Sequence, residues 1–138
     1  GAAQISAMKK IAGPLRLNLA QFRELAAFAE FGSELDATSL AQLERGRRVV
    51  EVLKQPQYDP VPVEEQVLAL YAVTEGHMDD VVVGDIRRFE SELREYFRVR
   101  HANVLAVISE TGKIPEGDDL TEGIAAFQDF FQGAETPE

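Results

Sequence analysis

The sequence predicts an all-α protein, an antiparallel helical bundle of about six or seven helices. Apolar residues recur at helical spacing along almost the whole chain, and capping residues, glycines and prolines divide this pattern into segments with short connections. The one run with strand propensity, Val81-Val82-Val83, has no partner strand in the sequence and predicts an extended connector. Short connections between amphipathic helices favour antiparallel neighbours packed around one core.

Two separate helices are expected in the N-terminal part of the chain. Residues 2–11 are rich in alanine, and Gly13-Pro14 ends that segment because proline is unfavourable inside a helix. Asn18 can cap the next helix, with Gln21 at the capping-box position, and Gly32 is placed to finish it.

The third expected helix begins at Asp36, which is a favourable capping residue, and carries Gly46 in its interior. An interior glycine costs about 1 kcal/mol relative to alanine, which suggests that another backbone approaches closely at this point. Arg45, Arg47 and Arg48 form the only dense basic cluster in the sequence. We expect them to pair with acidic residues about one turn away rather than to bind an anion.

Further helices follow from similar signals. Pro62 suits the first position of a helix that should stop near Gly76. The longest helical pattern starts around Gly84 or Asp85 and ends before Gly112, with a break near Arg100-His101.

Asp119 and Glu122 form a capping-box pattern that opens the last helix. Phe130 and Phe131 stand side by side near its end. We expect both rings to pack inside the chain, and the alternative is that one of them is exposed and contacts a neighbour.

Length and composition predict one helical domain over residues 1–133 and a frayed tail over residues 134–138. Cysteine is absent, which excludes disulfides and thiolate metal sites. No apolar run reaches the roughly 18 residues that a membrane span requires, so we expect no direct membrane insertion.

The formal net charge is −10, and most of it lies in the C-terminal half. Residues 1–69 contain eight Lys or Arg and nine Asp or Glu, whereas residues 70–138 contain six and fifteen. An acidic surface repels phosphate backbones and anionic lipid, so nucleic-acid binding is not expected. A basic protein partner would complement this surface, and the alternative is a solvated face that only aids solubility.

The segment Leu53–Tyr58 places two carboxamides, Gln55 and Gln57, on either side of Pro56. Proline biases the preceding residue away from helical geometry, so we expect the helix to stop here in a stiffened turn. A carboxamide offers N–H donors and a carbonyl acceptor, which complement the edge of an adenine. On turn chemistry alone, a surface turn that closes a helix is the simpler interpretation.

No pattern in the sequence assigns a catalytic residue, and we expect none. His77 with Asp79, Asp80 and His101 could be imagined as a metal site of oxygen and nitrogen ligands, but the polarity of a loop explains these residues better, and we expect no metal. Neither the phosphate-binding pattern Gly-x-x-x-x-Gly-Lys-Ser/Thr nor the nucleophile pattern Gly-x-Ser-x-Gly occurs in the sequence.

Several motifs follow one another in a characteristic order: GAAQ (residues 1–4), AMKKIAG (7–13), LAQFRELAAFA (19–29), FGSELD (31–36), KQPQ (54–57) and PVEEQV (62–67). Together they resemble the C-terminal domain of the alpha subunit of the F-type (rotary) ATP synthase. The likeness runs from Gly1 to about Gly112 and then fades. Members of that family often carry Asp where Glu34 stands, which leaves any contact of that side chain open.

The resemblance implies a small helical bundle in which Gln55 and Gln57 lie beside the adenine of the non-catalytic nucleotide site. The family's phosphate-binding loop and arginine finger precede this domain, so the chain resembles an excised piece that is not itself an enzyme. The parent complex would be a proton-translocating ATP synthase. ATP or ADP with Mg is implied for the full-length subunit, and no cofactor is expected in the fragment.

The implied partners are the ATP synthase beta and gamma subunits, with the delta subunit as a further candidate. The matching domains surround the rotating gamma stalk, and a packed helical body would transmit stalk rotation by moving as a unit. The resemblance also implies a peripheral position at the cytoplasmic face of the bacterial plasma membrane, as part of the ATP synthase head.

Two other classes of function stay open at this point. A free-standing acidic helical adaptor would bind a basic protein partner outside the ATP synthase. A small enzyme would use His77 or a pair of carboxylates.

Overall fold

The computed structural model describes residues 6–30, 34–58 and 60–135, without the side chains of residues 55–58 and 132–135. The described residues form six α-helices and one short 3-10 helix and contain no strand, which confirms the all-α prediction. The elements are α1 (Ser6–Glu30), α2 (Ala37–Tyr58), α3 (Val63–Thr74), η1 (Val83–Asp85), α4 (Ile86–Arg100), α5 (Ala102–Thr111) and α6 (Asp119–Glu135).

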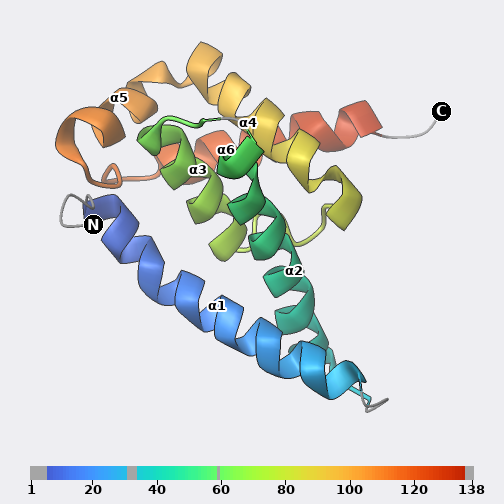
Figure 1. Ribbon diagram of the computed structural model, residues 1–138. Helices are drawn as coiled ribbons and strands as arrows, with labels where there is room; N and C mark the ends of the chain where they lie inside the picture. The colour runs from blue at the N-terminus through green and yellow to red at the C-terminus, as the bar shows by residue number, and fades with distance from the viewer. Residues whose placement is uncertain (1–5, 31–33, 59, 136–138) are drawn as a thin grey trace.

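The helices α1 and α2 meet at one end of the molecule and diverge toward the remaining helices, as Figure 1 shows. Helix α3 packs against both of them and also against α4 and α5, so it occupies the centre of the fold. The first turn of α1 lies beside the end of α5, where the backbone N–H of Ala7 donates to the carbonyl of Gly112 at 2.8 Å.

Helix α1 is one continuous helix with Pro14 inside it, so the expected break at Gly13-Pro14 and the expected cap at Asn18 are wrong. A proline removes one helical hydrogen bond and crowds the preceding turn, but it does not force the chain out of the helix. Ala7 and Ile11, on the turns before the proline, are buried, and α1 packs on α2 and α3. Tertiary packing therefore overrides the local signal.

Helix α2 also continues through a proline, and its backbone stays helical as far as Tyr58. The expected helix end before Pro56 is therefore wrong. Val49 and Val52, on the preceding turns, are almost fully buried and hold α2 in the core. Because the proline falls in the last turn, only one hydrogen bond to an earlier carbonyl is lost.

Most of the other expected boundaries are confirmed. The Asp36 carboxylate accepts a hydrogen bond from the backbone N–H of Ser39 at 2.8 Å, as an N-cap does. The helical pattern breaks between α4 and α5 at His101, whose backbone is not helical (φ −134°, ψ 40°). Gly112 ends α5 with a left-handed φ of 70°, a conformation that favours glycine.

Three expectations need small corrections or additions. Pro62 is the residue before α3 rather than its first residue. Helix α6 begins at Asp119, so the residue that precedes the helix is Asp118 rather than the expected Asp119. The Asp118 carbonyl accepts a hydrogen bond from the Glu122 backbone N–H at 2.8 Å. Helix α6 continues to Glu135, and the last three residues of the expected tail lie outside the described residues.

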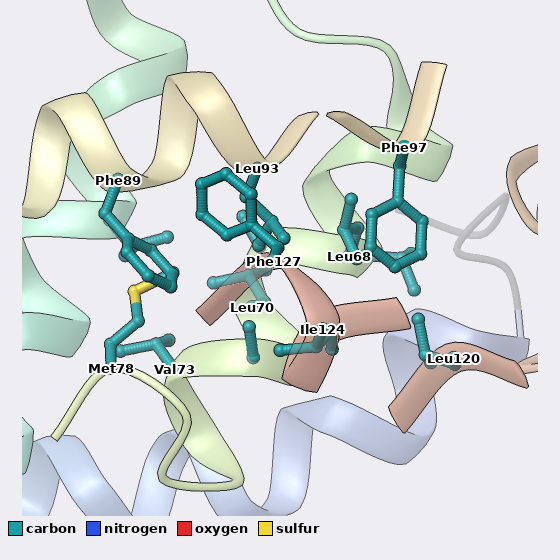
Figure 2. Close-up of a cluster of buried hydrophobic side chains, with 14 of the residues drawn as sticks. Leu68, Leu70, Val73, Met78, Phe89, Leu93, Phe97, Leu120, Ile124 and Phe127 are labelled. Carbon is teal, nitrogen blue, oxygen red and sulfur yellow. The ribbon is translucent and has the colours of Figure 1, made fainter. Parts of the chain in front are cut away.

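Figure 2 shows aromatic rings of α4 (Phe89 and Phe97) and α6 (Phe127) in the buried core, together with apolar side chains of α3. The Phe89 ring meets the rings of Phe127 and Phe131 edge to face, at centroid distances of 5.0 and 4.9 Å. Phe131 is 1% exposed, whereas Phe130 is 61% exposed. The expectation that both rings pack inside the chain is therefore wrong, and the alternative of one exposed ring is confirmed.

Gly46 lies where α2 crosses α1, and the group that approaches it is the Phe22 side chain rather than a backbone. A Cβ added at Gly46 would fall well inside van der Waals contact of the Phe22 Cβ. The absence of a side chain at residue 46 therefore sets how closely α1 and α2 approach.

We predict that Gly46→Ala lowers the free energy of unfolding by about 1 kcal/mol, because overpacking costs about 2 kcal/mol, the middle of the usual range, and the gain in helix propensity offsets about 1 kcal/mol of that cost. Urea unfolding followed by circular dichroism measures the change. Gly84→Ala is the control, since an added Cβ there meets nothing within 4 Å. A Gly46→Ala variant as stable as the wild type would contradict this packing.

Candidate functional site

The candidate site is the α2–α3 junction, which we define as residues 53–66. Gln55 and Gln57 lie in the last turn of α2, where the backbone is helical, and their side chains lie outside the described residues. The adenine-contact prediction for these two amides therefore stays a prediction. The structure does describe how the rest of the molecule holds the junction in place.

The backbone leaving the junction is fixed by hydrogen bonds around the start of α3. The carbonyl of Pro62 accepts from the backbone N–H groups of Glu65 and Gln66, both at 3.0 Å. The Gln66 side-chain amide donates to the carbonyl of Val61 at 2.7 Å, and Val61 is itself buried. These hydrogen bonds restrict the position of the backbone at the start of α3.

A small cavity of about 130 Å³ lies beneath the junction, between α1, α2, α3 and α4. Most of its lining is apolar, and Gln66 and Glu90 contribute its polar groups. Pockets that bind drug-sized ligands measure about 300–1,000 Å³. This cavity is therefore too small to enclose a nucleotide, and an adenine would have to rest on the surface of the junction.

Buried charges tie α3 to α4 immediately after the junction. Arg94 donates through Nη1 to Glu65 Oε1 at 3.0 Å and through Nε to Glu90 Oε1 at 2.7 Å. Arg98 approaches Glu65 Oε2 at 3.3 Å from the solvent side. Burial raises the pKa of Glu90 above its ordinary value, and the neighbouring Arg94 opposes that shift.

The basic cluster of α2 clamps the connection between α3 and α4. Arg47 and Arg48 pair with Glu44 on their own helix, as expected. Arg48 also donates to the carbonyl of Val81 at 2.9 Å. Arg45 forms a two-pronged pair with Asp79, with Nε–Oδ1 at 3.1 Å and Nη2–Oδ2 at 2.6 Å. The expectation of pairing within the helix is therefore wrong for Arg45.

The two histidines lie in aromatic surroundings. The His77 ring stacks on Tyr71 at a centroid distance of 6.5 Å, and the His101 ring lies 5.6 Å from Tyr96 and 4.9 Å from Phe97. Across residues 6–30, 34–58 and 60–135, no group of three or more His, Cys, Asp or Glu side chains could hold a metal ion. In the same ranges, none of the helices combines the length and apolar character needed to cross a membrane.

Residues 4–129 match the family model described as "ATP synthase alpha/beta chain, C terminal domain". The matched region continues beyond Gly112, so the expectation that the likeness fades there is wrong.

Three curated relatives show the same similarity over almost the whole chain. The chain is 59% identical over 133 residues to the ATP synthase subunit alpha of Mycobacterium leprae (strain Br4923), covering 95% of the chain and 24% of that protein. It is 57% identical over 128 residues to that of Lactococcus lactis subsp. lactis (strain IL1403), covering 93% and 26%. It is 53% identical over 133 residues to that of Limosilactobacillus reuteri (strain DSM 20016), covering 96% and 26%. The chain thus spans about a quarter of the length of these relatives.

We predict that Glu90→Gln becomes more stable relative to the wild type as pH rises. Burial raises the pKa of Glu90, so the folded chain binds this proton more tightly than the unfolded chain does. The wild type should therefore lose stability from about pH 4.3, the ordinary glutamate value, upward through the raised pKa. A glutamine does not ionise and escapes this loss.

Urea unfolding at a series of pH values measures the difference between the two proteins. Glu92→Gln is the matched control, because it removes an exposed carboxylate from the same helix. The prediction fails if the difference in unfolding free energy between Glu90→Gln and the wild type stays constant with pH, or if the variant becomes less stable relative to the wild type as pH rises.

Proposed function

The chain belongs to the family described as "ATP synthase alpha/beta chain, C terminal domain", and from this premise we propose that it is the helical C-terminal part of an alpha subunit that works in proton-driven ATP synthesis. The observation that carries the proposal is the match of residues 4–129 to that family, together with 53–59% identity to proteins named ATP synthase subunit alpha. In this assignment, the domain performs no chemistry of its own.

The proposed role is mechanical. The domain packs beside the beta subunits around the central gamma stalk, with the delta subunit as a further candidate partner. Contacts between distant segments support a rigid body: Ala7 with Gly112, Arg45 with Asp79, and Arg94 with Glu65. Such a body passes on the asymmetry of a rotating shaft as a rigid-body shift.

The proposed contribution to nucleotide binding is limited to the adenine. Gln55 and Gln57 of the KQPQ motif would contact the base of ATP or ADP in the non-catalytic site, while the phosphates and Mg bind elsewhere in the full-length subunit. The support for this proposal is the motif itself, its place at the end of α2, and the anchoring of α2 through Val49 and Val52. The ATP synthase head that contains this domain would lie at the cytoplasmic face of the bacterial plasma membrane, as a peripheral part of the complex.

The two alternatives have less support. An enzyme that uses His77 would need that imidazole in a reactive cleft, whereas its ring stacks on Tyr71. A free-standing adaptor would explain the acidic C-terminal half but not the family match across residues 4–129.

We predict that the double change Gln55→Ala and Gln57→Ala in the full-length subunit weakens nucleotide occupancy of the non-catalytic site. Each lost amide contact to the base should cost about 1 kcal/mol, which corresponds to a combined loss of about tenfold or more in affinity. Bound nucleotide retained by the purified complex is measured after gel filtration.

Gln42→Ala is the matched control, because it removes an amide from the same helix away from the junction. Circular dichroism should show the same helical content for all three proteins. Equal retention by the double variant and the control would rule out the adenine assignment.

We also predict that the 138-residue chain alone neither hydrolyses ATP nor binds it appreciably, because two amides can supply only contacts to the base. Isothermal titration with Mg-ATP and a phosphate-release assay check this. A dissociation constant in the low micromolar range would overturn the view that the phosphates are bound elsewhere.

A further inference from the structure

The cavity beneath the α2–α3 junction has apolar walls and a volume of about 130 Å³. Most of its wall consists of apolar side chains of α1, α2 and α3, among them Met8, Leu15, Val52, Leu53, Ala69 and Leu70. An engineered apolar cavity of about 150 Å³ in another protein stays dry and binds benzene. The cavity therefore has the size for a single small ring.

One polar group in this wall lacks a full set of partners, namely the Glu90 carboxylate of α4. Glu90 is 3% exposed, and its Oε1 accepts from Arg94 Nε at 2.7 Å. None of the described residues donates to its second oxygen, Oε2. No side-chain nitrogen or oxygen of the described residues is both fully enclosed and without a partner, so Oε2 keeps some accessible surface. Because Glu90 lines the cavity, the cavity is where a donor could reach this oxygen.

Water alone would fill this space poorly. A buried water molecule makes about three hydrogen bonds to polar groups of the protein. In the described lining, Glu90 and Gln66 are the polar residues, and the Gln66 side-chain amide already donates to the carbonyl of Val61 at 2.7 Å. A molecule with an apolar body and a single donor would satisfy the Glu90 acceptor and leave no other polar group of its own unpaired.

The charges around Glu90 favour an uncharged donor. Arg94 pairs with Glu65 and Glu90, and Arg98 pairs with Glu65, so two guanidiniums balance two carboxylates. An ammonium group in the cavity would add a buried charge without a counter-charge, which is costly. A neutral hydroxyl gives a charge-assisted hydrogen bond to the carboxylate without that cost.

We propose that this cavity binds a small uncharged phenol, whose ring packs among Met8, Leu53 and Leu70 and whose hydroxyl donates to Glu90 Oε2. The ligand would contact side chains of α1, α2, α3 and α4 at once, and would stabilise the folded chain as its concentration rises. The proposal does not use Gln55 or Gln57, so it can fail while the proposed nucleotide contact holds.

The two methionines of the chain report on binding. Met8 lines the cavity, whereas Met78 is 0% exposed in the core and lies outside the lining. In the 138-residue chain with isotope-labelled methionine methyl groups, NMR titration with phenol should shift the Met8 signal in a saturable way and leave the Met78 signal unchanged. We expect a dissociation constant of about 1 mM, which is within the affinity limit for so small a ligand.

Two further probes test the chemistry of the ligand. Fluorobenzene has nearly the size of phenol but no donor, and benzylammonium carries its donor on a charged group. Phenol should bind at least about fivefold more tightly than either of them. Glu90→Leu should remove the preference for phenol over fluorobenzene without weakening fluorobenzene binding. Glu92→Leu, which removes an exposed carboxylate from the same helix, should preserve that preference.

Variants that fill the cavity test its location. Ala69→Val adds two methyl groups to the wall and should weaken binding of both phenol and fluorobenzene at least about tenfold. Leu15→Phe fills the cavity from α1 and serves if Ala69→Val does not fold. Ala106→Val on α5, outside the lining, is the control. Circular dichroism verifies that the variants keep their helical content.

Three results would overturn the proposal. A Met8 signal that does not move at about 10 mM phenol, ten times the expected dissociation constant, would show that the cavity takes no such ring. Equal or tighter binding of fluorobenzene or benzylammonium would show that Glu90 Oε2 does not select an uncharged donor. Binding that survives both filling variants would place the ligand elsewhere on the protein.

Discussion

The burial of α3 is the constraint on which the rest of the structure depends. Its residues from Val67 to Val73 are buried except Tyr71, so this helix is apolar almost all round and needs neighbours on every side. Helices α1, α2, α4 and α5 supply that cover. Glu65 is the one acidic group buried at the start of α3, and it pairs with Arg94, which also pairs with Glu90, and with Arg98. A buried carboxylate without such a partner would be strongly destabilising.

Charged side chains of α2 fix the segment between α3 and α4, which lies outside this central packing. Arg45 and Arg48 of α2 hold the segment between α3 and α4 through Asp79 and the carbonyl of Val81. The same helix ends at the α2–α3 junction, so the clamp and the proposed adenine contact belong to one rigid element.

The sequence predicts what depends on local chemistry and misses what depends on packing. The cap at Asp36 and the end at Gly112 follow from side-chain and backbone rules, and both are confirmed. The prolines at positions 14 and 56 predict helix ends because their local effect is unfavourable, whereas burial on the neighbouring turns keeps both helices continuous. Rules based on local chemistry do not include the stabilisation that comes from this burial.

The sequence pattern also does not predict ion pairs between distant residues, or which of two adjacent aromatic residues is buried. Arg45 and Asp79 are 34 residues apart, and no spacing rule links them. Phe130 and Phe131 differ in burial because successive residues turn by about 100° around a helix, and the facing of α6 is set by its contacts. The proposed role of Gln55 and Gln57 comes from the likeness of a motif, not from physical reasoning about the amides.

The proposed adenine contact is tested most directly by a structure of the assembled ATP synthase that contains this alpha subunit with nucleotide in the non-catalytic site. The amide groups of Gln55 and Gln57 should lie at hydrogen-bond distance, roughly 2.7–3.2 Å, from the adenine. An adenine held entirely by other residues, with both glutamines turned to solvent, would contradict the proposed contact.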